Sequence, residues 1–316
     1  MMRALAITGP TASGKTALSI ELASAIDGEI ISCDSMQIYR EMSIGTAKAT
    51  AEERAAVPHH MIDFLEPNVP YSADNYRADA LRVVDEIASR GKTPIFVGGT
   101  GLYIDTVSRA PAPDVPSSNP KYRERALAAL KTPEDVHALW DRLRAVDPIS
   151  AEKIHENNVK RVIRALEIYD ATGKPKSYFD ELTKDAAPPI KIDMITLDFH
   201  SRERLYERID RRVDRMLEDG LLDEARSLFK RGLLSSDTTA GQAIGYKELR
   251  GYLEGESLLE DAVENLKLAS RRYAKRQLTW FRRSDAYRLY LDDSEGVMRP
   301  FDDVVSELIS VAWSLI

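Results

Sequence analysis

The chain of 316 residues has almost no cysteine and no apolar run long enough to cross a bilayer. Its one cysteine, Cys33, excludes an internal disulfide and any zinc site built from several cysteines. A membrane-spanning helix needs about 20 consecutive apolar residues. The apolar stretch before Gly9 is also too short for the core of a signal peptide. These absences predict a cytoplasmic protein with no membrane partner.

The chain also has fewer basic than acidic residues. The 44 lysines and arginines are outnumbered by 51 aspartates and glutamates, which gives a formal net charge of −7. Taken alone, this balance argues against a nucleic-acid partner. Net charge averages over the whole surface, however, so the distribution of the charges along the chain has to decide. The composition is otherwise that of a globular protein, with 43% hydrophobic and 30% charged residues.

Strands and helices are expected to alternate in the first third of the chain. The patterns predict buried strands over 3–8, 29–33 and 92–97, and helices over 17–25 and 73–90. The stretch 40–70 is expected to be irregular. This alternation predicts an α/β fold in which helices flank a parallel sheet.

A proline-rich stretch over 110–120 predicts a domain boundary. Beyond it, 121–172 have helical patterning without strands, and 173–189 are rich in helix breakers. A strand is then expected over 190–199, followed by mostly helical sequence, a last strand within 286–291 and a closing helix over 301–316. We therefore predict a core made of 1–115 and 190–316, with a small all-helical domain inserted at 116–189.

Residues 9–16 read Gly-Pro-Thr-Ala-Ser-Gly-Lys-Thr and match the phosphate-loop pattern G-x-x-x-x-G-K-[ST] between a strand and a helix. The glycines let backbone N–H groups curl around a phosphate, and the helix adds the positive end of its dipole. Lys15 supplies a point charge, and the Thr16 hydroxyl is a candidate Mg²⁺ ligand. The loop does not specify the ligand, so ATP, GTP and a pyrophosphate ester all stay open.

Polar residues follow two more of the expected strands and should meet the phosphate loop at one sheet edge. Asp34 fits three roles equally: a Mg²⁺-holding carboxylate, a general base or a turn residue. Asp198 is a weaker candidate for the Mg²⁺ role, since a strand-end cap is a common function of such residues. The glycines of 98–101 let the backbone approach a ligand and direct the Thr100 hydroxyl into the cleft, although an ordinary tight turn explains them as well.

The adjacent His59 and His60, with Asp63 nearby, raise the alternative of a metal site. Neighbouring residues in a strand point to opposite faces, and no third ligand has suitable spacing. A packing role in the loop is therefore the favoured interpretation.

Seven basic residues and no acidic one occur over 265–284: Lys267, Arg271, Arg272, Lys275, Arg276, Arg282 and Arg283. A helix with this stripe, interleaved with Tyr273 and Trp280, favours binding of a phosphate backbone over a merely solvated face. Over 202–215, arginines alternate with acidic residues, which predicts mostly surface ion pairs of little energetic value, with one arginine near the phosphate. A third basic patch spans 157–164 and places Lys160 and Arg164 on one helix face.

Together these motifs resemble, from end to end and in order, the tRNA dimethylallyltransferase family of bacterial type, also called tRNA isopentenyltransferase. Besides the phosphate loop, the resemblance rests on 34–40, 44–48, 58–63, 98–103, 161–167, 242–247 and 275–280. It implies a core like that of P-loop NTPases. The implied activity is transfer of a dimethylallyl group from dimethylallyl diphosphate to the exocyclic amine of the adenosine next to the tRNA anticodon, with release of pyrophosphate. The phosphate loop then holds the prenyl diphosphate in place of ATP.

The resemblance also implies roles for individual residues. Asp34 is the general base, Thr100 helps to position the amine, and Lys15 and Arg212 act on the diphosphate. The implied diphosphate contacts are Gly9, Thr11, Ala12, Ser13, Gly14, Lys15, Thr16 and Arg212, with Mg²⁺ near Thr16. The implied tRNA contacts are Asp34, Ser35, Met36, Gln37, Arg123, Lys160, Arg161, Arg164, Gln242, Gly245, Tyr246, Lys247, Lys275, Arg276, Gln277, Trp280 and Arg282. The helical insert is expected to clamp the anticodon stem-loop, and the protein to act as a monomer.

Two other functions stay open. A small-molecule kinase would keep ATP in the loop and use Asp34 as base toward a hydroxyl, but it has no need of the basic stripe. An RNA-binding nucleotide switch without chemistry would bind tRNA and form no product. If tRNA is the partner, we interpret the excess of acidic residues outside the basic patches as a restraint on nonspecific RNA binding.

Overall fold

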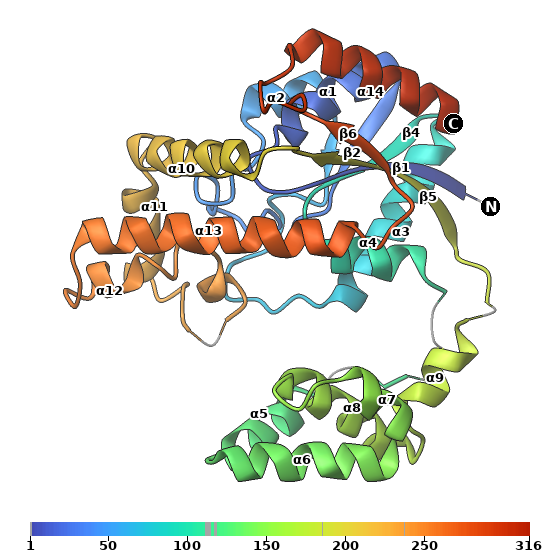
Figure 1. Cartoon of the computed structure of the whole chain (residues 1–316), viewed down its shortest axis with the longest axis vertical. Helices are drawn as coiled ribbons and strands as arrows, with labels where there is room; N and C mark the ends of the chain where they lie inside the picture. The colour runs from blue at the N-terminus through green and yellow to red at the C-terminus, as the bar shows by residue number, and fades with distance from the viewer. Residues whose placement is uncertain (1, 111–114, 117–118, 185, 237) are drawn as a thin grey trace. The chain divides into compact units, whose positions relative to one another are not determined.

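The computed structural model describes residues 2–110, 115–116, 119–184, 186–236 and 238–316. Contacts divide the chain into two compact units, one of Met1–Ser108 with Ile190–Ile316 and one of Arg109–Pro189. We call them the core unit and the inserted unit (Figure 1). The inserted unit thus begins at Arg109, before the boundary at 116 that the sequence predicted. The prolines and neighbours at 111–114 and 117–118 lie outside the described residues.

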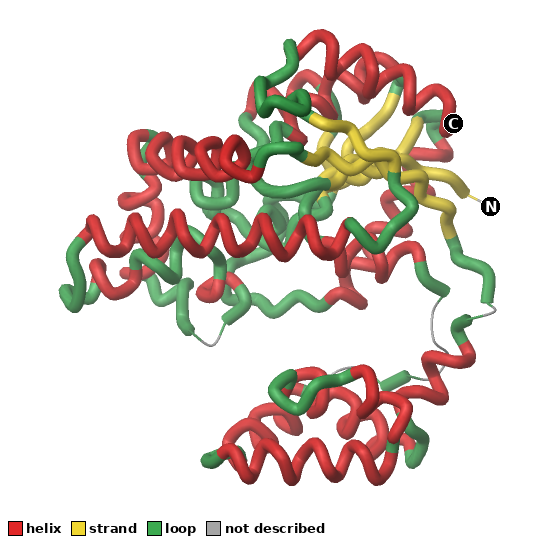
Figure 2. Tube along the Cα trace, viewed as in Figure 1, coloured by secondary structure: helices red, strands yellow, loops and turns green. Residues whose placement is uncertain are grey.

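A six-stranded sheet forms the centre of the core unit (Figure 2). Its strands are β1 (Met2–Thr8), β2 (Gly28–Ser32), β3 (His59–His60), β4 (Thr93–Val97), β5 (Ile190–Asp198) and β6 (Tyr287–Tyr290). They follow the order β3-β2-β4-β1-β5-β6, and every neighbouring pair is parallel. The predicted α/β class with a parallel sheet is confirmed.

The prediction of an irregular segment over 40–70 was wrong at two places. Helix α2 (Ala51–Ala56) begins with a capping box in which Thr50 and Glu53 bond each other's backbone N–H groups. Strand β3 has only two residues, and so short an element shows no periodicity in the sequence. Its pairing with β2 is a tertiary contact that the local sequence does not display.

Side-chain alternation along β1 explains why helices cover both faces of the sheet. Leu5 and Ile7 join one apolar core, and Ala4 and Ala6 join the other. Helices α1 (Lys15–Ala25) and α14 (Phe301–Leu315) pack into the first core. Helices α3 (Ala73–Ser89) and α4 (Gly101–Ser108) pack into the second.

A third apolar cluster lies beside the sheet, among α10 (Arg202–Glu218), α11 (Leu221–Lys230), η1 (Ala240–Gln242), α12 (Arg250–Leu253) and α13 (Leu259–Phe281). Helix α13 joins two cores. Its first half buries Ala262 and Leu266 in this cluster, and its second half buries Ala274 and Leu278 against the sheet core. Helices α10 and α13 lie side by side (Figure 1).

The inserted unit contains α5 (Pro120–Ala129), α6 (Pro133–Val146), α7 (Pro148–Lys153), α8 (Val159–Thr172) and α9 (Lys176–Leu182). Its described residues form no strand, as predicted, and Leu143, Val162 and Leu166 contribute to a core of their own. Helix α9 was missed because it lies in the breaker-rich stretch; Pro175 stands at its N-cap, where a proline is compatible with helix entry. In the described parts of both units, no helix has the length and apolarity needed to span a membrane.

Candidate active site

The phosphate loop joins β1 to α1 through an unusual backbone path. Gly9, Ala12 and Gly14 have φ angles of 140°, 63° and 84°. A Cβ on Gly9 would lie 2.8 Å from the carbonyl oxygen of Leu197, so only glycine fits there. Gly14 caps α1 without a side-chain hydrogen bond. The first backbone N–H groups of α1 are therefore available to a phosphate.

Lys15 lies over this loop. Its Nζ donates to the carbonyl oxygens of Pro10 at 2.7 Å and Gly9 at 3.1 Å. Burial, reinforced by the nearby Arg212 guanidinium, lowers the pKa of Lys15 to about 7, against a smaller opposing effect of Asp34. A bound anion would relieve the repulsion between the two cations, so this arrangement is suited to a negatively charged ligand.

Two arginines of α10 contact the loop. The Arg212 guanidinium donates to the Thr11 hydroxyl at 2.5 Å, and Nε of Arg208 donates to the carbonyl oxygen of Ala12 at 2.9 Å. Burial lowers the pKa of both guanidinium groups. The sequence predicted one arginine at the phosphate, and the resemblance assigned it to Arg212. Sequence reasoning missed Arg208, because nothing in the alternating charges distinguishes it from its neighbours.

Asp34 lies two residues beyond the end of β2 and forms a turn, one of the three roles predicted for it. Its Oδ1 accepts hydrogen bonds from the N–H groups of Met36 at 2.8 Å and Gln37 at 3.4 Å, which closes a turn. The described residues place no donor on Oδ2, so that oxygen is available to a ligand. The Thr100 hydroxyl accepts from the Ser35 N–H at 3.2 Å and thereby joins the same turn.

Two cavities meet at Asp34. The larger, of about 880 Å³, includes Thr11–Ala17 of the phosphate loop and its first helical turn, together with Arg208. The smaller, of about 280 Å³, is lined by apolar side chains of α10 and α13 and by several predicted tRNA contacts, namely Ser35, Met36, Gln242, Lys247 and Arg276. Both cavities share Thr11, Asp34, Thr46, Arg212, Met216 and Tyr273. A phosphate chamber and a second chamber with fewer charged side chains thus adjoin at Asp34 and Arg212.

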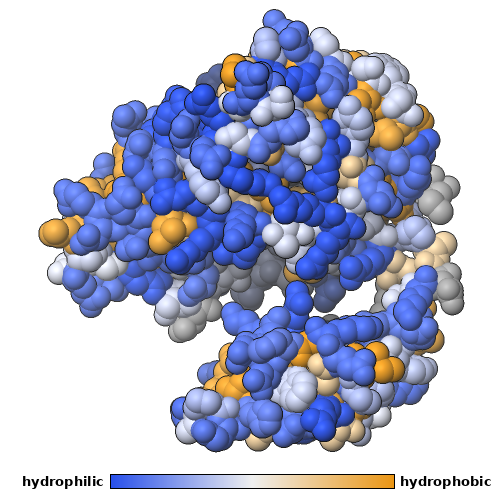
Figure 3. Space-filling model, viewed as in Figure 1, coloured by the Kyte–Doolittle hydropathy of each residue, from blue (hydrophilic) through white to orange (hydrophobic). Residues whose placement is uncertain are grey.

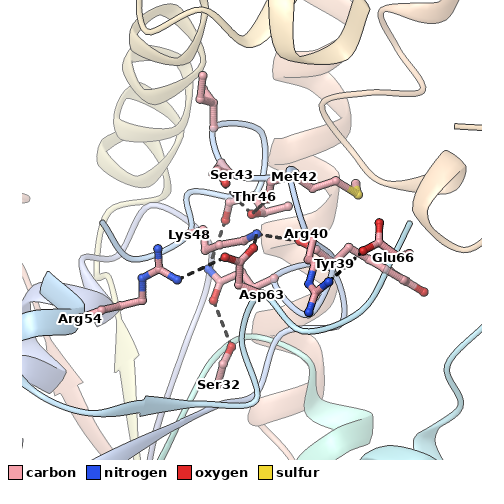
Figure 4. A network of polar contacts seen from close by, with 12 residues as sticks. Ser32, Tyr39, Arg40, Met42, Ser43, Thr46, Lys48, Arg54, Asp63 and Glu66 are labelled. Atoms are coloured by element: carbon pink, nitrogen blue, oxygen red, sulfur yellow. Dashed lines mark hydrogen bonds and ion pairs between the residues drawn. The ribbon is translucent and has the colours of Figure 1, made fainter. Parts of the chain in front are cut away.

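A buried cation holds the loop that faces the phosphate loop (Figure 4). Nζ of Lys48 donates to the Tyr39 carbonyl oxygen and to the Asp63 carboxylate, both at 2.6 Å, and Arg54 pairs with the same carboxylate at 3.4 Å. Gln37, a predicted tRNA contact, uses its amide within this loop: it accepts from Ser32 Oγ and donates to backbone carbonyl oxygens. These bonds fix the wall of the cleft.

The residues considered as alternative metal ligands, His59, His60 and Asp198, bond other groups of the protein. His59 bonds the Val57 carbonyl oxygen at 2.7 Å, and His60 bonds Glu29 at 2.6 Å. Across the described residues, no three His, Cys, Asp or Glu side chains gather as a metal site would need. Asp198 accepts from the Phe199 N–H at 2.8 Å and pairs with Arg288 at 3.2 Å, as a strand-end cap does.

Comparison with known proteins places these features in a family. The IPP transferase family model matches residues 37–284, and an isopentenyl transferase model matches residues 2–63. A tRNA dimethylallyltransferase of Shouchella clausii is 49% identical over 303 residues, which cover 95% of each chain. The chain belongs to the tRNA dimethylallyltransferase family. Another relative with that name, from Geobacillus kaustophilus, is 50% identical over 277 residues, or 87% of this chain and 86% of the relative.

Solved structures of dimethylallyltransferases share the fold. The tRNA isopentenylpyrophosphate transferase of Bacillus halodurans superposes with a TM-score of 0.72 at 42% identity, covering 99% of this chain and 96% of that one. A eukaryotic dimethylallyltransferase acting on tRNA gives a TM-score of 0.78 at 32% identity, covering 92% and 74%. The resemblance to this family is therefore confirmed, and so is the P-loop NTPase-like core that it implied.

Two of the seven cations in the basic stripe of α13 form ion pairs with α10. Lys267 pairs with Asp214 at 2.7 Å and Arg271 pairs with Asp210 at 2.6 Å, both across to α10. The other five members are exposed and have no carboxylate partner in the part of the chain that the structure describes: Arg272, Lys275, Arg276, Arg282 and Arg283. Hydrophilic colour accordingly dominates Figure 3 where Figure 1 draws α13.

The side chains of two other predicted tRNA contacts on α13 make contacts within the protein. Gln277 is buried; its amide accepts from the Thr11 N–H at 2.9 Å and donates to the Gly99 carbonyl oxygen at 3.1 Å. Trp280 packs on Gly101, where an added Cβ would lie 2.3 Å from the indole. Gln277 thus ties α13 to the phosphate loop, a role that sequence reasoning missed, and a contact of its side chain with tRNA stays a prediction.

The segment 242–247 is also held internally. Tyr246 is buried and donates to Glu224 at 2.7 Å, and Glu224 accepts from the N–H groups of Ser43, Ile44 and Gly45. Gln242 donates to the Ser236 carbonyl oxygen at 2.6 Å. Gly245 adopts a φ of 105°. This segment therefore supports the Ser43–Gly45 loop, besides any contact with tRNA.

The four basic residues assigned to tRNA in the inserted unit fall into two pairs. Arg123 and Arg164 bond the buried Glu167 at 2.9 Å and 2.8 Å. Burial alone would raise the pKa of Glu167. The hydrogen bonds from the Asn119 N–H and these two arginines lower it by more, so the pKa of Glu167 lies below its usual value. Lys160 and Arg161 are exposed and form no ion pair among the described residues. The latter pair is available to a polyanion.

Proposed function

We propose that this chain transfers a dimethylallyl group from dimethylallyl diphosphate to the exocyclic amine of the adenosine next to the anticodon of tRNA. The observation that carries the proposal is the junction of the two cavities at Asp34 and Arg212. The phosphate chamber suits the diphosphate of the donor, and the second chamber, lined by the exposed cations Lys247 and Arg276, suits a base of the acceptor. The carboxylate between them suits the proton transfer that joins the two.

The donor half of the reaction needs stabilisation of the leaving group. The bond between the allylic carbon and the diphosphate oxygen breaks, and its electron pair stays on the pyrophosphate. Loop N–H groups, Lys15 and Arg212 are arranged to meet this charge. One preorganised donor of this kind is worth about 3 kcal/mol in a site shielded from water.

Mg²⁺ fits the same chamber. Thr16 lines it together with Asp34, and a hydroxyl oxygen supplemented by diphosphate oxygens and water is the donor set that this small, hard cation accepts. We propose that the Thr16 hydroxyl holds the ion. When bound, Mg²⁺ supplies further positive charge to the leaving diphosphate.

The acceptor half needs a base within reach of the adenine amine. Oδ2 of Asp34 accepts the proton that the amine loses as the new nitrogen–carbon bond forms, while the turn held by Oδ1 and Thr100 fixes the carboxylate. An adenine stacked in the anticodon loop does not reach this junction. The base is therefore flipped out of its stack, at a cost of a few kcal/mol.

The exposed cations supply the contacts with the tRNA backbone. On α13 these are Lys275 and Arg276, and in the inserted unit they are Lys160 and Arg161. We propose that the inserted unit clamps the anticodon stem-loop and that the protein acts as a monomer in the cytoplasm. Phosphate contacts of this kind position the RNA, and the site at Asp34 selects the base.

The decisive experiment is a reaction of the purified protein with unmodified tRNA, labelled dimethylallyl diphosphate and Mg²⁺, followed by mass spectrometry of the tRNA nucleosides. We expect a dimethylallyl group on the adenosine next to the anticodon, and none with Asp34→Asn. Label passing only from ATP to a small hydroxyl compound would establish the kinase instead. tRNA binding without product under any condition would establish the switch.

A further inference from the structure

The arginines of α10 are not neutralised in the way that their sequence suggested. The acidic residues interleaved with them bond elsewhere: Asp210 and Asp214 pair with α13, and Glu207 pairs with Arg204. Four arginines of this helix have no carboxylate partner among the residues that the structure describes: Arg208, Arg211, Arg212 and Arg215. Their spacing of three and four residues places them along one face of the helix.

All four arginines line the cavity of about 880 Å³ beside the phosphate loop. Its described lining contains seven lysines and arginines but three carboxylates, those of Asp34, Glu53 and Asp219. Glu53 is engaged in the capping box of α2. Lys48 and Arg54 are paired with Asp63, which leaves five unpaired cations in the described lining of the chamber. Lys15, Arg208 and Arg212 contact the phosphate loop, whereas Arg211 and Arg215 make no described contact with it.

The unpaired cations of the chamber lie at different depths. Arg212 reaches inward to Thr11, whereas Arg211 and Arg215 are exposed at the rim. Arg208 stands between the two groups. Its Nε is fixed on the Ala12 carbonyl oxygen, and its Nη2 lies 3.9 Å from the position that a Cβ on Gly14 would take. Its two terminal nitrogens can therefore bond a phosphate at the mouth of the loop.

We propose that Arg208, Arg211 and Arg215 form an outer phosphate subsite, which captures the entering diphosphate and receives the departing pyrophosphate. The proposal rests on the proposed function, because it assumes that the inner site binds the diphosphate of the donor. A leaving group held by preorganised donors dissociates slowly, and product release limits the turnover of many enzymes. With a second set of cations beside the first, pyrophosphate can bond the outer arginines before it has lost all its bonds to the inner site. The same cations attract the donor from solution.

Binding of inorganic pyrophosphate tests the subsite directly. Equilibrium dialysis with labelled pyrophosphate should show one tight and one weak site in the wild-type protein. Lys15→Ala should remove the tight site and keep the weak one. The triple variant Arg208→Gln/Arg211→Gln/Arg215→Gln should do the reverse. Arg204→Gln is the matched control, since it removes an arginine of the same helix that is paired with Glu207 and does not line the cavity.

Stopped-flow association of dimethylallyl diphosphate provides the second measurement. We expect the triple glutamine variant to associate about tenfold more slowly at low salt and to lose most of the salt dependence. The charge-preserving variant Arg208→Lys/Arg211→Lys/Arg215→Lys should restore both, which separates the effect from misfolding. A wild-type protein that prenylates tRNA but has one pyrophosphate site, and associates no faster than the glutamine variant, would overturn the outer subsite alone. Failure of the phosphate loop itself to bind pyrophosphate would overturn the proposed function with it.

Discussion

Helices α10 and α13 pack against each other and are both rich in basic residues, but different members of each set are free. In α10, Arg208, Arg211, Arg212 and Arg215 have no described carboxylate partner, although acidic residues stand between them in the sequence. In α13, which has no acidic residue after Glu264, Lys267 and Arg271 are nonetheless neutralised. The aspartates of α10 have paired across the helix interface.

The availability of a charge on these helices depends on which helix face carries it. Asp210 and Asp214 lie four residues apart and face α13 together, so they are separated from the arginine face that lines the phosphate cavity. In the proposed function, the unpaired cations of α10 meet the diphosphate and those of α13 meet the tRNA.

The largest effect should come from Asp34, where the cavities beside both helices meet. We expect Asp34→Asn to lower kcat by about 10²–10⁴, because the amide cannot take the proton of the amine but preserves the shape of the turn. Affinity for tRNA and for dimethylallyl diphosphate should change little. Steady-state kinetics and binding assays on the same preparation check both parts, and near wild-type turnover would remove Asp34 from the role of base.

The inner cation of α10 should come next. Arg212→Gln should lower kcat by about 10²–10³, through loss of a donor to the leaving diphosphate. The neighbouring Arg204→Gln, whose partner is Glu207, should have little effect. Single-turnover rates with saturating tRNA measure the difference, and equal rates for the two variants would contradict the division of α10 into free and paired arginines.

The stripe on α13 permits a matched test with tRNA. Lys275→Ala/Arg276→Ala removes two unpaired cations and should reduce the salt slope of log Kobs by about 2. Lys267→Ala/Arg271→Ala removes the two cations that are paired with α10, and should leave the slope nearly unchanged. Titrations of tRNA at several salt concentrations compare the pairs. Identical slopes for both double variants would mean that pairing does not decide which cations meet the RNA.

The smallest expected effect is the uptake of a proton by Lys15 when a diphosphate binds. With a pKa of about 7, Lys15 is largely neutral at pH 8 in the unliganded protein and charged when a diphosphate binds. Binding at pH 8 should therefore take up a proton and binding at pH 6 should not, so the contribution of Lys15 to affinity falls as the pH rises above 7. Calorimetry in buffers of different ionisation enthalpy measures the uptake. Lys15→Arg should abolish it, and unchanged uptake in that variant would assign the proton to another group.

Much of the fold could be predicted from local patterns. The strands that became β1, β2, β4, β5 and β6, the helices after them and the helical insert all have periodicities or punctuation that short windows display. Helix α9 and strand β3 could not be predicted in this way. The first depends on the position of Pro175 at a helix start, and the second on pairing with β2.

The candidate site also contains residues that local patterns predicted and residues that they did not. The phosphate loop, Asp34 and the glycines before Thr100 were evident as motifs, and the structure brings them to one junction. The second arginine at the loop and the internal role of Gln277 were not evident. Both depend on contacts between residues far apart in the chain, and a single sequence has no signal for them.

The phosphate loop, the order of strands and helices and the family could be read from the sequence, because they depend on backbone preferences and residue types within short windows. Which cations are unpaired depends on the packed structure, since an ion pair requires two side chains to meet in space, whatever their separation in sequence. The net charge of −7 and the alternating charges of 202–215 described composition alone. Packing of α10 against α13 pairs Asp210 and Asp214 with basic residues of α13, so the arginine face of α10 lines the phosphate cavity without a described carboxylate partner.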